Sequence, residues 1–364
     1  MIDITAAVAT SPEGPFSLSA GRLEEPRAEE VRVRIRGVGI CHTDLVMKAS
    51  GYFNGGVLGH EGAGIVEKVG EDVTDLAPGD HVVLSYFACH HCATCGAGQP
   101  AYCERFTRAN ASGGRLDGSS PLSIGGESAK GVFFYQSSFA THAIAHRNNA
   151  VKVDASLPIE ILGPLGCGFQ TGAGAVLNTL QARAGEGIAI FGAGAVGLAA
   201  TMAAKAAGAD PIIVVDRIDD KLETARRLGA THTLNGAEVD VVEEIRRIRP
   251  GGVHHALECV GVPTLLEQAV AVLRPTGTCA LLGVGATGAS ARINLMTLLQ
   301  GRTLKGVIEG DSDPRTFIPR LIGLYQEGRF PFDTLVRTYP FDQINQAIED
   351  MASGRVVKPV LLPD

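Results

Sequence analysis

The stretch IAIFGAGAVG, residues 188–197, decides the fold of much of this chain. Its four leading apolar residues predict a short buried strand, and the small residues from about 195 to 207 predict a helix directly after it. The turn between them has the pattern G-x-G-x-x-G, which is typical of a loop that holds the pyrophosphate of a dinucleotide at a helix N-terminus. We therefore predict a coenzyme-binding loop made of Gly192, Ala193, Gly194, Ala195, Val196 and Gly197.

The next apolar strand, residues 212–216, ends on Asp216, nineteen residues after Gly197. A carboxylate at this spacing accepts hydrogen bonds from the adenosine ribose and repels a 2′-phosphate. Arg217 follows and could pair with such a phosphate, but we expect the carboxylate to dominate because its charge lies where the phosphate would go. The pattern favours NAD over NADP, and it disfavours the alternative of a glycine-rich turn that only packs a helix on a sheet.

Strands and helices alternate through the second half of the chain. We predict a helix at 219–228 and strands at 232–234, 255–260 and 278–283, an alternation typical of βαβ units in a parallel sheet. Residues 31–38, 61–70 and 80–85 predict short strands of an irregular, mostly-β region. Towards the end we expect helices at about 315–327 and 341–351 and a final strand at 358–362.

Composition excludes several classes of protein. The chain has 364 residues, of which 45% are hydrophobic and 20% charged, so it can bury the cores of two domains. A net charge of −7 argues against nucleic-acid and membrane partners. The N-terminal residues do not resemble a signal peptide, and the longest apolar stretch, Ala193–Ala204, is too short to span a bilayer. We expect a cytoplasmic protein.

Four of the eight cysteines form one cluster with the spacing C-x2-C-x2-C-x7-C: Cys89, Cys92, Cys95 and Cys103. Four thiolates in one loop make a closed tetrahedral site, which suits structural zinc. An iron–sulfur cluster also takes four thiolates, but its usual cysteine spacing differs. His90 and His91 are alternative ligands within the loop, although four cysteines already complete the shell.

Cys41, His60 and Cys167 are far apart in sequence, and each lies in a glycine-containing segment. Alone, each residue is more often part of a core than a ligand. Two cysteines and one histidine together are a ligand set of catalytic zinc, because three protein ligands leave a fourth position for water or substrate.

These motifs resemble those of the zinc-dependent medium-chain alcohol dehydrogenase family. The shared elements are G-H-E-x2-G at 59–64, the four-cysteine lobe at about 88–104, G-C-G-F-Q-T-G at 166–172 and the coenzyme loop. Residues 133–153 and 328–336 look most similar to bacterial aryl (benzyl) alcohol dehydrogenases. The resemblance implies an α/β protein with an irregular, mostly-β catalytic domain (1–168 and 309–364) and a Rossmann domain with a doubly wound parallel sheet that binds NAD (169–308).

The resemblance also implies residue roles. Cys41, His60 and Cys167 would hold the catalytic zinc, Glu61 would lie just behind it, and Asp44 would orient His60. Thr43 would hydrogen-bond the alcohol oxygen. The residues implied around the coenzyme are His42 and Lys358 at the pyrophosphate, Thr171 and Val196 at the nicotinamide, and Asp216 and Lys221 at the adenosine ribose.

The implied reaction is oxidation of a primary aromatic or allylic alcohol to the aldehyde with NAD as hydride acceptor. Alternatives are a glutathione-dependent formaldehyde dehydrogenase and a zinc-free quinone reductase, and the latter lacks the three ligands. Val46 stands where animal members carry a proton-relay histidine, so we expect either His42 or solvent reached through the coenzyme ribose to take the proton. The small Ser85 is expected to leave room for a ring in the pocket. The family is dimeric or tetrameric, so we expect a homodimer or homotetramer that pairs edge strands near 303–309.

Overall fold

The computed structural model describes residues 1–363, and Asp364, the last residue of the predicted 309–364 segment, lies outside them. The chain divides into two compact units. The described residues of the first are Met1–Cys167, Asp313–Pro319 and 333–363, and the second comprises Gly168–Ser312 and Arg320–Phe332. Gly168 and residues 309–312 and 320–332, which the sequence assigns to the catalytic domain, therefore pack with the second unit.

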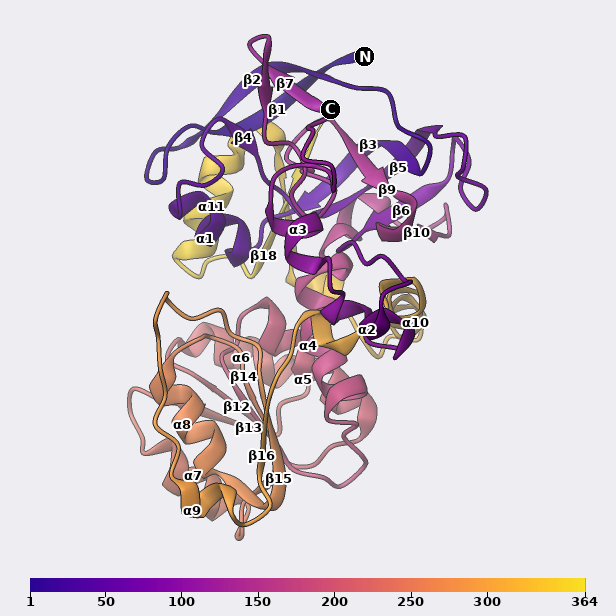
Figure 1. Cartoon of the computed structure of the whole chain (residues 1–364). Helices are drawn as coiled ribbons and strands as arrows, with labels where there is room; N and C mark the ends of the chain where they lie inside the picture. Colours follow the sequence, from indigo (N-terminus) through magenta and orange to yellow (C-terminus); the bar gives the residue numbers. More distant parts are fainter. Residues whose placement is uncertain (364) are drawn as a thin grey trace. The chain divides into compact units, whose positions relative to one another are not determined.

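The second unit contains a six-stranded sheet with the order β13-β12-β11-β14-β15-β16, in which all neighbours are parallel (Figure 1). The order reverses between β11 and β14, which is where sheets of this kind bind ligands. The predicted α/β class with a doubly wound parallel sheet is confirmed. The strands are β11 (Ile188–Phe191), β12 (Ile212–Asp216), β13 (His232–Asn235), β14 (Val253–Glu258), β15 (Leu273–Leu281) and β16 (Thr303–Gly306).

Helices alternate with these strands, and the predicted helices at 195–207 and 219–228 are confirmed. The helices are α4 (Gly168–Gly174), α5 (Ala195–Ala207), α6 (Asp219–Leu228), α7 (Val241–Ile248), α8 (Pro263–Ala271) and α9 (Leu295–Leu298). α10 (Pro314–Gln326) crosses the division between the units. Two strand predictions are wrong at their ends: β15 spans Leu273–Leu281 instead of 278–283, and β14 stops at Glu258 instead of residue 260. The backbone turns after Glu258, so Cys259 lies outside the sheet.

The first unit contains two mostly antiparallel sheets. One has the order β4-β1-β2-β7-β8, and the other runs β10-β6-β5-β3-β18-β17 with β9 also paired to β3. The strands are β1 (Ile2–Ala9), β2 (Phe16–Leu23), β3 (Glu30–Gly39), β4 (Gly56–Val57), β5 (Glu61–Val69), β6 (His81–Leu84), β7 (Leu122–Ile124), β8 (Glu127–Ala129), β9 (His142–His146), β10 (Ala150–Val153), β17 (Val336–Pro340) and β18 (Lys358–Leu362).

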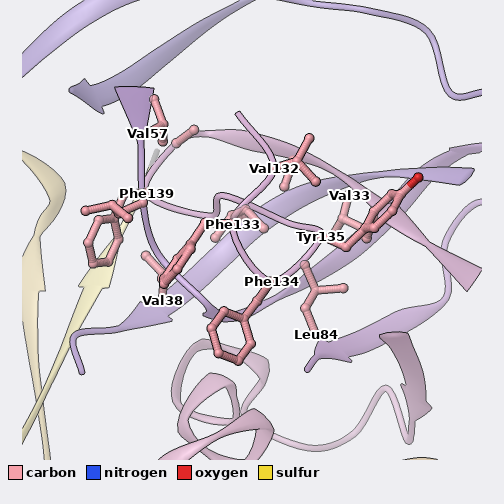
Figure 2. Packing of buried hydrophobic residues seen from close by; sticks show 14 of the residues in the cluster. Val33, Val38, Val57, Leu84, Val132, Phe133, Phe134, Tyr135 and Phe139 are labelled. Carbon is pink, nitrogen blue, oxygen red and sulfur yellow. The ribbon is translucent and has the colours of Figure 1, made fainter. Parts of the chain in front are cut away.

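Short helices complete this unit: α1 (His42–Ala49), α2 (Ala93–Gly96), α3 (Phe106–Ala111) and α11 (Ile344–Ala352). Its core joins the sheets to the loop between β8 and β9, whose Phe133, Phe134 and Tyr135 pack among Val38, Val57 and Leu84 (Figure 2). Among the described residues, no helix is both long and apolar enough to cross a membrane.

Candidate functional site

Four potential ligands from distant parts of the sequence meet inside the first unit. The ligand atoms of Cys41, His60, Glu61 and Cys167 all lie within 4.8 Å of one another. Cys41 immediately precedes α1, His60 and Glu61 lie where β5 begins, and Cys167 follows the turn Gly163–Gly166. The structure thus brings together the three predicted zinc ligands and the glutamate predicted to lie behind the metal.

Asp44 ties two of these ligands together. Its Oδ2 accepts a hydrogen bond from the Cys41 backbone N–H at 3.0 Å. Its Oδ1 accepts one from the Gly59 N–H at 3.0 Å and lies 2.8 Å from His60 Nδ1. Both Asp44 and His60 are fully buried. The carboxylate therefore holds the proton on Nδ1, which leaves Nε2 as the nitrogen that can bind a metal.

The donor set fits zinc. His60 Nε2 is buried and has no hydrogen-bond partner, which is costly unless an ion occupies the space beside it. In a tetrahedral site with Zn–S bonds of ~2.3 Å, neighbouring ligand atoms lie about 3.8 Å apart, which the observed 4.8 Å limit accommodates. A hydrogen bond with Cys167 lowers the pKa of Cys41, and the nearby His60 lowers it further. Together these effects outweigh burial, which raises the pKa, so the thiolate that a metal needs is favoured.

Glu61 forms a buried ion pair with Lys358. Lys358 Nζ lies 2.9 and 2.8 Å from the two carboxylate oxygens and also donates to the Ile40 carbonyl. Burial raises the pKa of Glu61, and Lys358 opposes that shift. Lys358 is only 2% exposed, and its partners Glu61 and Ile40 lie in the same unit, so the structure gives it a partner other than the predicted pyrophosphate.

The remaining predicted catalytic residues lie on α1. Thr43 Oγ1 is 3.8 Å from Cys41 Sγ, so its hydroxyl borders the metal cluster. His42 is exposed, and Val46 lies one turn later and is also exposed. Ser85 differs from our expectation: its side chain is fully buried and its hydroxyl donates to the Gly166 carbonyl at 2.6 Å, because that carbonyl faces it. Ser85 thus supports the segment before Cys167 rather than presenting a small side chain to a pocket.

The four-cysteine lobe forms a second cluster in the same unit. The sulfur atoms of Cys89, Cys92, Cys95 and Cys103 lie within 4.8 Å of one another. Cys92 caps α2 by accepting the Cys95 N–H, and that bond lowers the pKa of Cys92 to about 6. Neither His90 nor His91 belongs to this set. His91 Nδ1 lies 2.7 Å from the Cys89 carbonyl, and His90 contacts Arg315.

The coenzyme loop has the backbone its sequence requires. Gly192 has a φ of +103°, which side chains rarely allow. A Cβ on Gly197 would lie 1.8 Å from the Gly192 carbonyl oxygen. Helix α5 can therefore pack this closely against the loop only if residue 197 is glycine. Asp216, at the end of β12, accepts the Ala193 N–H at 2.7 Å and also the N–H groups of Arg217 and Ile218.

Four other predicted coenzyme residues lie in the second unit, whereas His42 and Lys358 belong to the first. Thr171 is half-buried in α4, and its hydroxyl faces Glu309 Oε2 at 3.4 Å. Val196 and Lys221 are half-buried at the beginnings of α5 and α6, and Arg217 is exposed beside Asp216. Glu309 was not predicted to have a definite role. The structure buries it and bonds it to Gln170 as well, at 2.9 Å.

Comparison with known proteins identifies the family. The model "Alcohol dehydrogenase GroES-like domain" matches residues 27–155, and "Zinc-binding dehydrogenase" matches residues 195–325. Geraniol dehydrogenase of Castellaniella defragrans is 44% identical over 370 residues, which cover 99% of this chain and 98% of the relative. The chain belongs to the zinc-dependent medium-chain alcohol dehydrogenase family.

Solved structures agree with this assignment to the dehydrogenases. An alcohol dehydrogenase zinc-binding domain protein from Burkholderia ambifaria is 50% identical with a TM-score of 0.97, and benzyl alcohol dehydrogenase from Acinetobacter calcoaceticus is 45% identical with a TM-score of 0.96. Both matches cover 100% of each chain. The expected similarity to bacterial aryl alcohol dehydrogenases is confirmed. The protein is an oxidoreductase that acts on small alcohols, with zinc and a nicotinamide nucleotide as cofactors.

Proposed function

We propose that this dehydrogenase oxidises primary allylic or aromatic alcohols to aldehydes with NAD. The reaction removes the hydroxyl proton and a hydride from the substrate, and its products are the aldehyde, NADH and a proton. The buried cluster of Cys41, His60 and Cys167, with its one unpartnered imidazole nitrogen, carries the proposal. A ligand set of three leaves one coordination position open, which catalytic zinc requires and a structural site does not provide.

Each residue around the cluster has a distinct role in this proposal. Cys41, His60 and Cys167 would hold zinc, which when bound supplies Lewis-acid stabilisation of negative charge on an oxygen. Asp44 keeps the imidazole in the required tautomer through the 2.8 Å contact. Thr43 borders the cluster, and its hydroxyl would accept the substrate hydroxyl proton while passing its own proton outward through the coenzyme ribose. Glu61 remains behind the ligands, held by Lys358.

The substrate class rests on two relatives that are named for different alcohols. Geraniol is a primary allylic alcohol and benzyl alcohol is a primary aromatic one, and both enzymes share about 45% identity with this chain. The two alcohols share an unsaturated carbon next to the alcohol carbon. We infer that a planar, unsaturated group beside the CH₂OH is the feature this protein selects.

NAD is the proposed coenzyme because of Asp216. Its carboxylate accepts three backbone N–H groups, which leaves acceptor capacity for a ribose hydroxyl. The same backbone contacts stabilise its negative charge, which disfavours a 2′-phosphate. Thr171 and Val196 would contact the nicotinamide, while Lys221 and the ribose face of Asp216 would hold the adenosine half.

A substrate screen tests the proposal. NAD reduction is followed with geraniol, cinnamyl alcohol, benzyl alcohol, their saturated counterparts and S-hydroxymethylglutathione. We expect kcat/KM for each unsaturated alcohol to exceed that of its saturated counterpart by at least about tenfold, or ~1.4 kcal/mol in transition-state binding. Equal kcat/KM values for each unsaturated alcohol and its saturated counterpart would contradict the proposed specificity. A preference for S-hydroxymethylglutathione would instead assign the glutathione-dependent formaldehyde branch.

We also propose that the protein is a homodimer formed through the β16 edge of the second unit. All four residues of β16 are exposed, and the neighbouring Leu295, Met296 and Leu299 are 73%, 68% and 76% exposed. An open strand edge beside exposed apolar side chains is a surface that favours pairing with another chain. A homotetramer would need a further interface.

A further inference from the structure

One buried amide joins segments that carry different metal ligands. Gln136 is 1% exposed and lies in the loop between β8 and β9. Its Nε2 donates to the His60 carbonyl at 2.9 Å and to the Ser85 carbonyl at 3.2 Å. Its Oε1 accepts the Gly62 N–H at 3.0 Å and the Ser138 hydroxyl at 2.8 Å. Both donors and both acceptor positions of this side chain are thus used.

The backbone that presents Gln136 is strained. Phe134, Tyr135 and Ser137 have φ values of +50°, +51° and +48°, a region that side chains other than glycine seldom adopt. Asn149 Nδ2 holds the Phe134 and Tyr135 carbonyls at 3.1 and 3.3 Å. Such conformations persist where surrounding contacts enforce them, and they concentrate at functional sites.

The same turn also packs against the imidazole of His60. The ring of Phe134 is stacked on it at a centroid distance of 4.5 Å, and Phe133 meets it edge-on at 5.3 Å. The rings of Phe133 and Phe134 also contact each other, at a centroid distance of 4.9 Å, and both are labelled in Figure 2. Because two rings fix the imidazole plane and Gln136 fixes the His60 backbone, the turn restrains this ligand at both ends.

From Ser85 the connection continues to the third ligand. The Ser85 carbonyl accepts from Gln136, and its hydroxyl donates to the Gly166 carbonyl, one residue before Cys167. A Cβ on Gly166 would lie 2.0 Å from the Leu84 carbonyl, so the two segments are in direct contact. A single amide therefore links the strand of His60, through Ser85, to the turn that presents Cys167.

We propose that Gln136 is a positioning residue of the metal centre: its amide fixes the distance between His60 and Cys167, so that the site keeps its zinc. This inference rests on the proposed zinc site at Cys41, His60 and Cys167. It concerns retention of the ion. The four-cysteine lobe is unaffected, because the four hydrogen bonds of the Gln136 side chain all go to residues outside that lobe.

The test is the rate at which zinc passes from the intact protein to a coloured chelator. The Gln136→Leu variant keeps the side-chain size and removes all four hydrogen bonds. Zinc should leave the two sites in two kinetic phases. The phase that is missing in Cys41→Ser belongs to the site of Cys41, His60 and Cys167, which is called the open site below. We expect Gln136→Leu to release zinc from that site ~10–100-fold faster, as loss of a supporting contact typically does, while release from the four-cysteine site changes by less than about twofold.

Asn345→Leu is the matched control. Asn345 also clamps backbone, since it donates to the Phe16 carbonyl at 2.9 Å and accepts the Phe16 N–H at 2.9 Å, but it touches no ligand-bearing segment. We expect both release rates to stay at wild-type values. Equal acceleration at both sites in Gln136→Leu, or none at the open site, would overturn the inference.

If Gln136→Leu does not fold, Ser138→Ala takes its place. It removes only the Ser138 hydroxyl contact to Gln136, and we expect release from the open site to rise about fivefold, the effect of one hydrogen bond. An unchanged rate would contradict the inference. If the wild-type protein itself lacks the open-site phase, the proposed zinc site is wrong. A wild-type protein with both phases and an unaffected Gln136→Leu variant refutes the role of Gln136 alone.

Discussion

Two aspartates each connect parts of the chain that the chemistry needs together. Asp44 joins Cys41 to His60, and Asp216 joins the end of β12 to the coenzyme loop at Ala193. Each carboxylate is held by backbone N–H groups, which stabilise its negative charge. A substitution of Asp44 or Asp216 therefore removes backbone hydrogen bonds and also removes a negative charge beside the metal cluster or the coenzyme loop.

Asp216 should decide between the two nicotinamide coenzymes. In Asp216→Ala the repulsion of a 2′-phosphate is lost and Arg217 becomes available to pair with it. We expect the ratio of kcat/KM for NADP to that for NAD to rise by at least ~10-fold, a change of about 1.4 kcal/mol. Both coenzymes should also bind more weakly, because Ala193 loses its acceptor. Because this weaker binding affects both coenzymes, it cancels in the ratio, which therefore reports the effect of the charge.

Asp219→Ala is the control for the coenzyme ratio. Asp219 is an exposed carboxylate three residues along the chain, and it accepts a hydrogen bond from the Asn235 side chain. Its removal changes the net charge equally but leaves the end of β12 intact. An unchanged ratio in Asp216→Ala, or an equal shift in Asp219→Ala, would show that the carboxylate position does not select the coenzyme.

His42 is the residue we expect to release the substrate proton. It is exposed at the first position of α1, next to Thr43, and Val46 one turn later cannot carry a proton. An imidazole can accept and release a proton and a glutamine side chain cannot, so His42→Gln should flatten the pH profile of alcohol oxidation at saturating NAD. His232→Gln, an exposed histidine of the second unit, should leave the profile unchanged. A wild-type profile in His42→Gln would assign proton release to solvent.

At the scale of elements, the four-cysteine lobe should act as a unit that stabilises without catalysing. Cys92 both contributes to the cluster and caps the four-residue helix α2, which is too short to persist on its own. In Cys92→Ser we expect loss of one zinc per chain and a Tm lowered by ~5 °C or more, with the second zinc retained. Elemental analysis and calorimetry measure the two effects.

Cys259→Ala controls for loss of a cysteine outside both clusters, and we expect it to keep two zinc ions. If Cys92→Ser lost both zinc ions, or neither, the two clusters would not be independent sites.

Elements with a strong local pattern could be predicted from the sequence. The predicted spans of β11, α5, β12 and β18 coincide with the structure, because apolar runs, glycine turns and small-residue helices are local signals. The two metal clusters were also predictable, since cysteine and histidine in glycine-rich segments are distinctive. Cys259 was misplaced because the end of β14 depends on Glu258, whose carboxylate accepts the N–H groups of residues 260–262.

Contacts between distant side chains could not be predicted. Lys358 pairs with Glu61 across 297 positions, and Gln136 reaches Ser85 across 51. Neither residue lies in a motif, and a lone buried glutamine or lysine has no sequence pattern that names its partner. Positive φ at Phe134 was equally unpredictable, because aromatic residues disfavour it and only the surrounding hydrogen bonds enforce it.

At the scale of the whole molecule, the β16 edge should control assembly. Edge strands are commonly protected by charged side chains, and Lys305 is the only charged residue of this strand. Its ammonium is paired with Asp311, so the charge that would repel a second copy is neutralised. Leu299, beside this edge in sequence and 76% exposed, is then an apolar surface whose burial stabilises a dimer.

Leu299→Glu should therefore shift the protein towards monomer. A carboxylate buried at a symmetric interface meets its own copy or loses its hydration, and either cost exceeds the ~1.5–3 kcal/mol that burying a leucine contributes. Light scattering after size exclusion should give twice the chain mass of 37.9 kDa for the wild type and a lower, concentration-dependent value for the variant. Leu18→Glu, at an exposed leucine of the first unit, should leave the mass unchanged. If the wild type is a monomer, the proposed interface does not exist. If the Leu299→Glu variant remains a dimer, the interface lies on another surface.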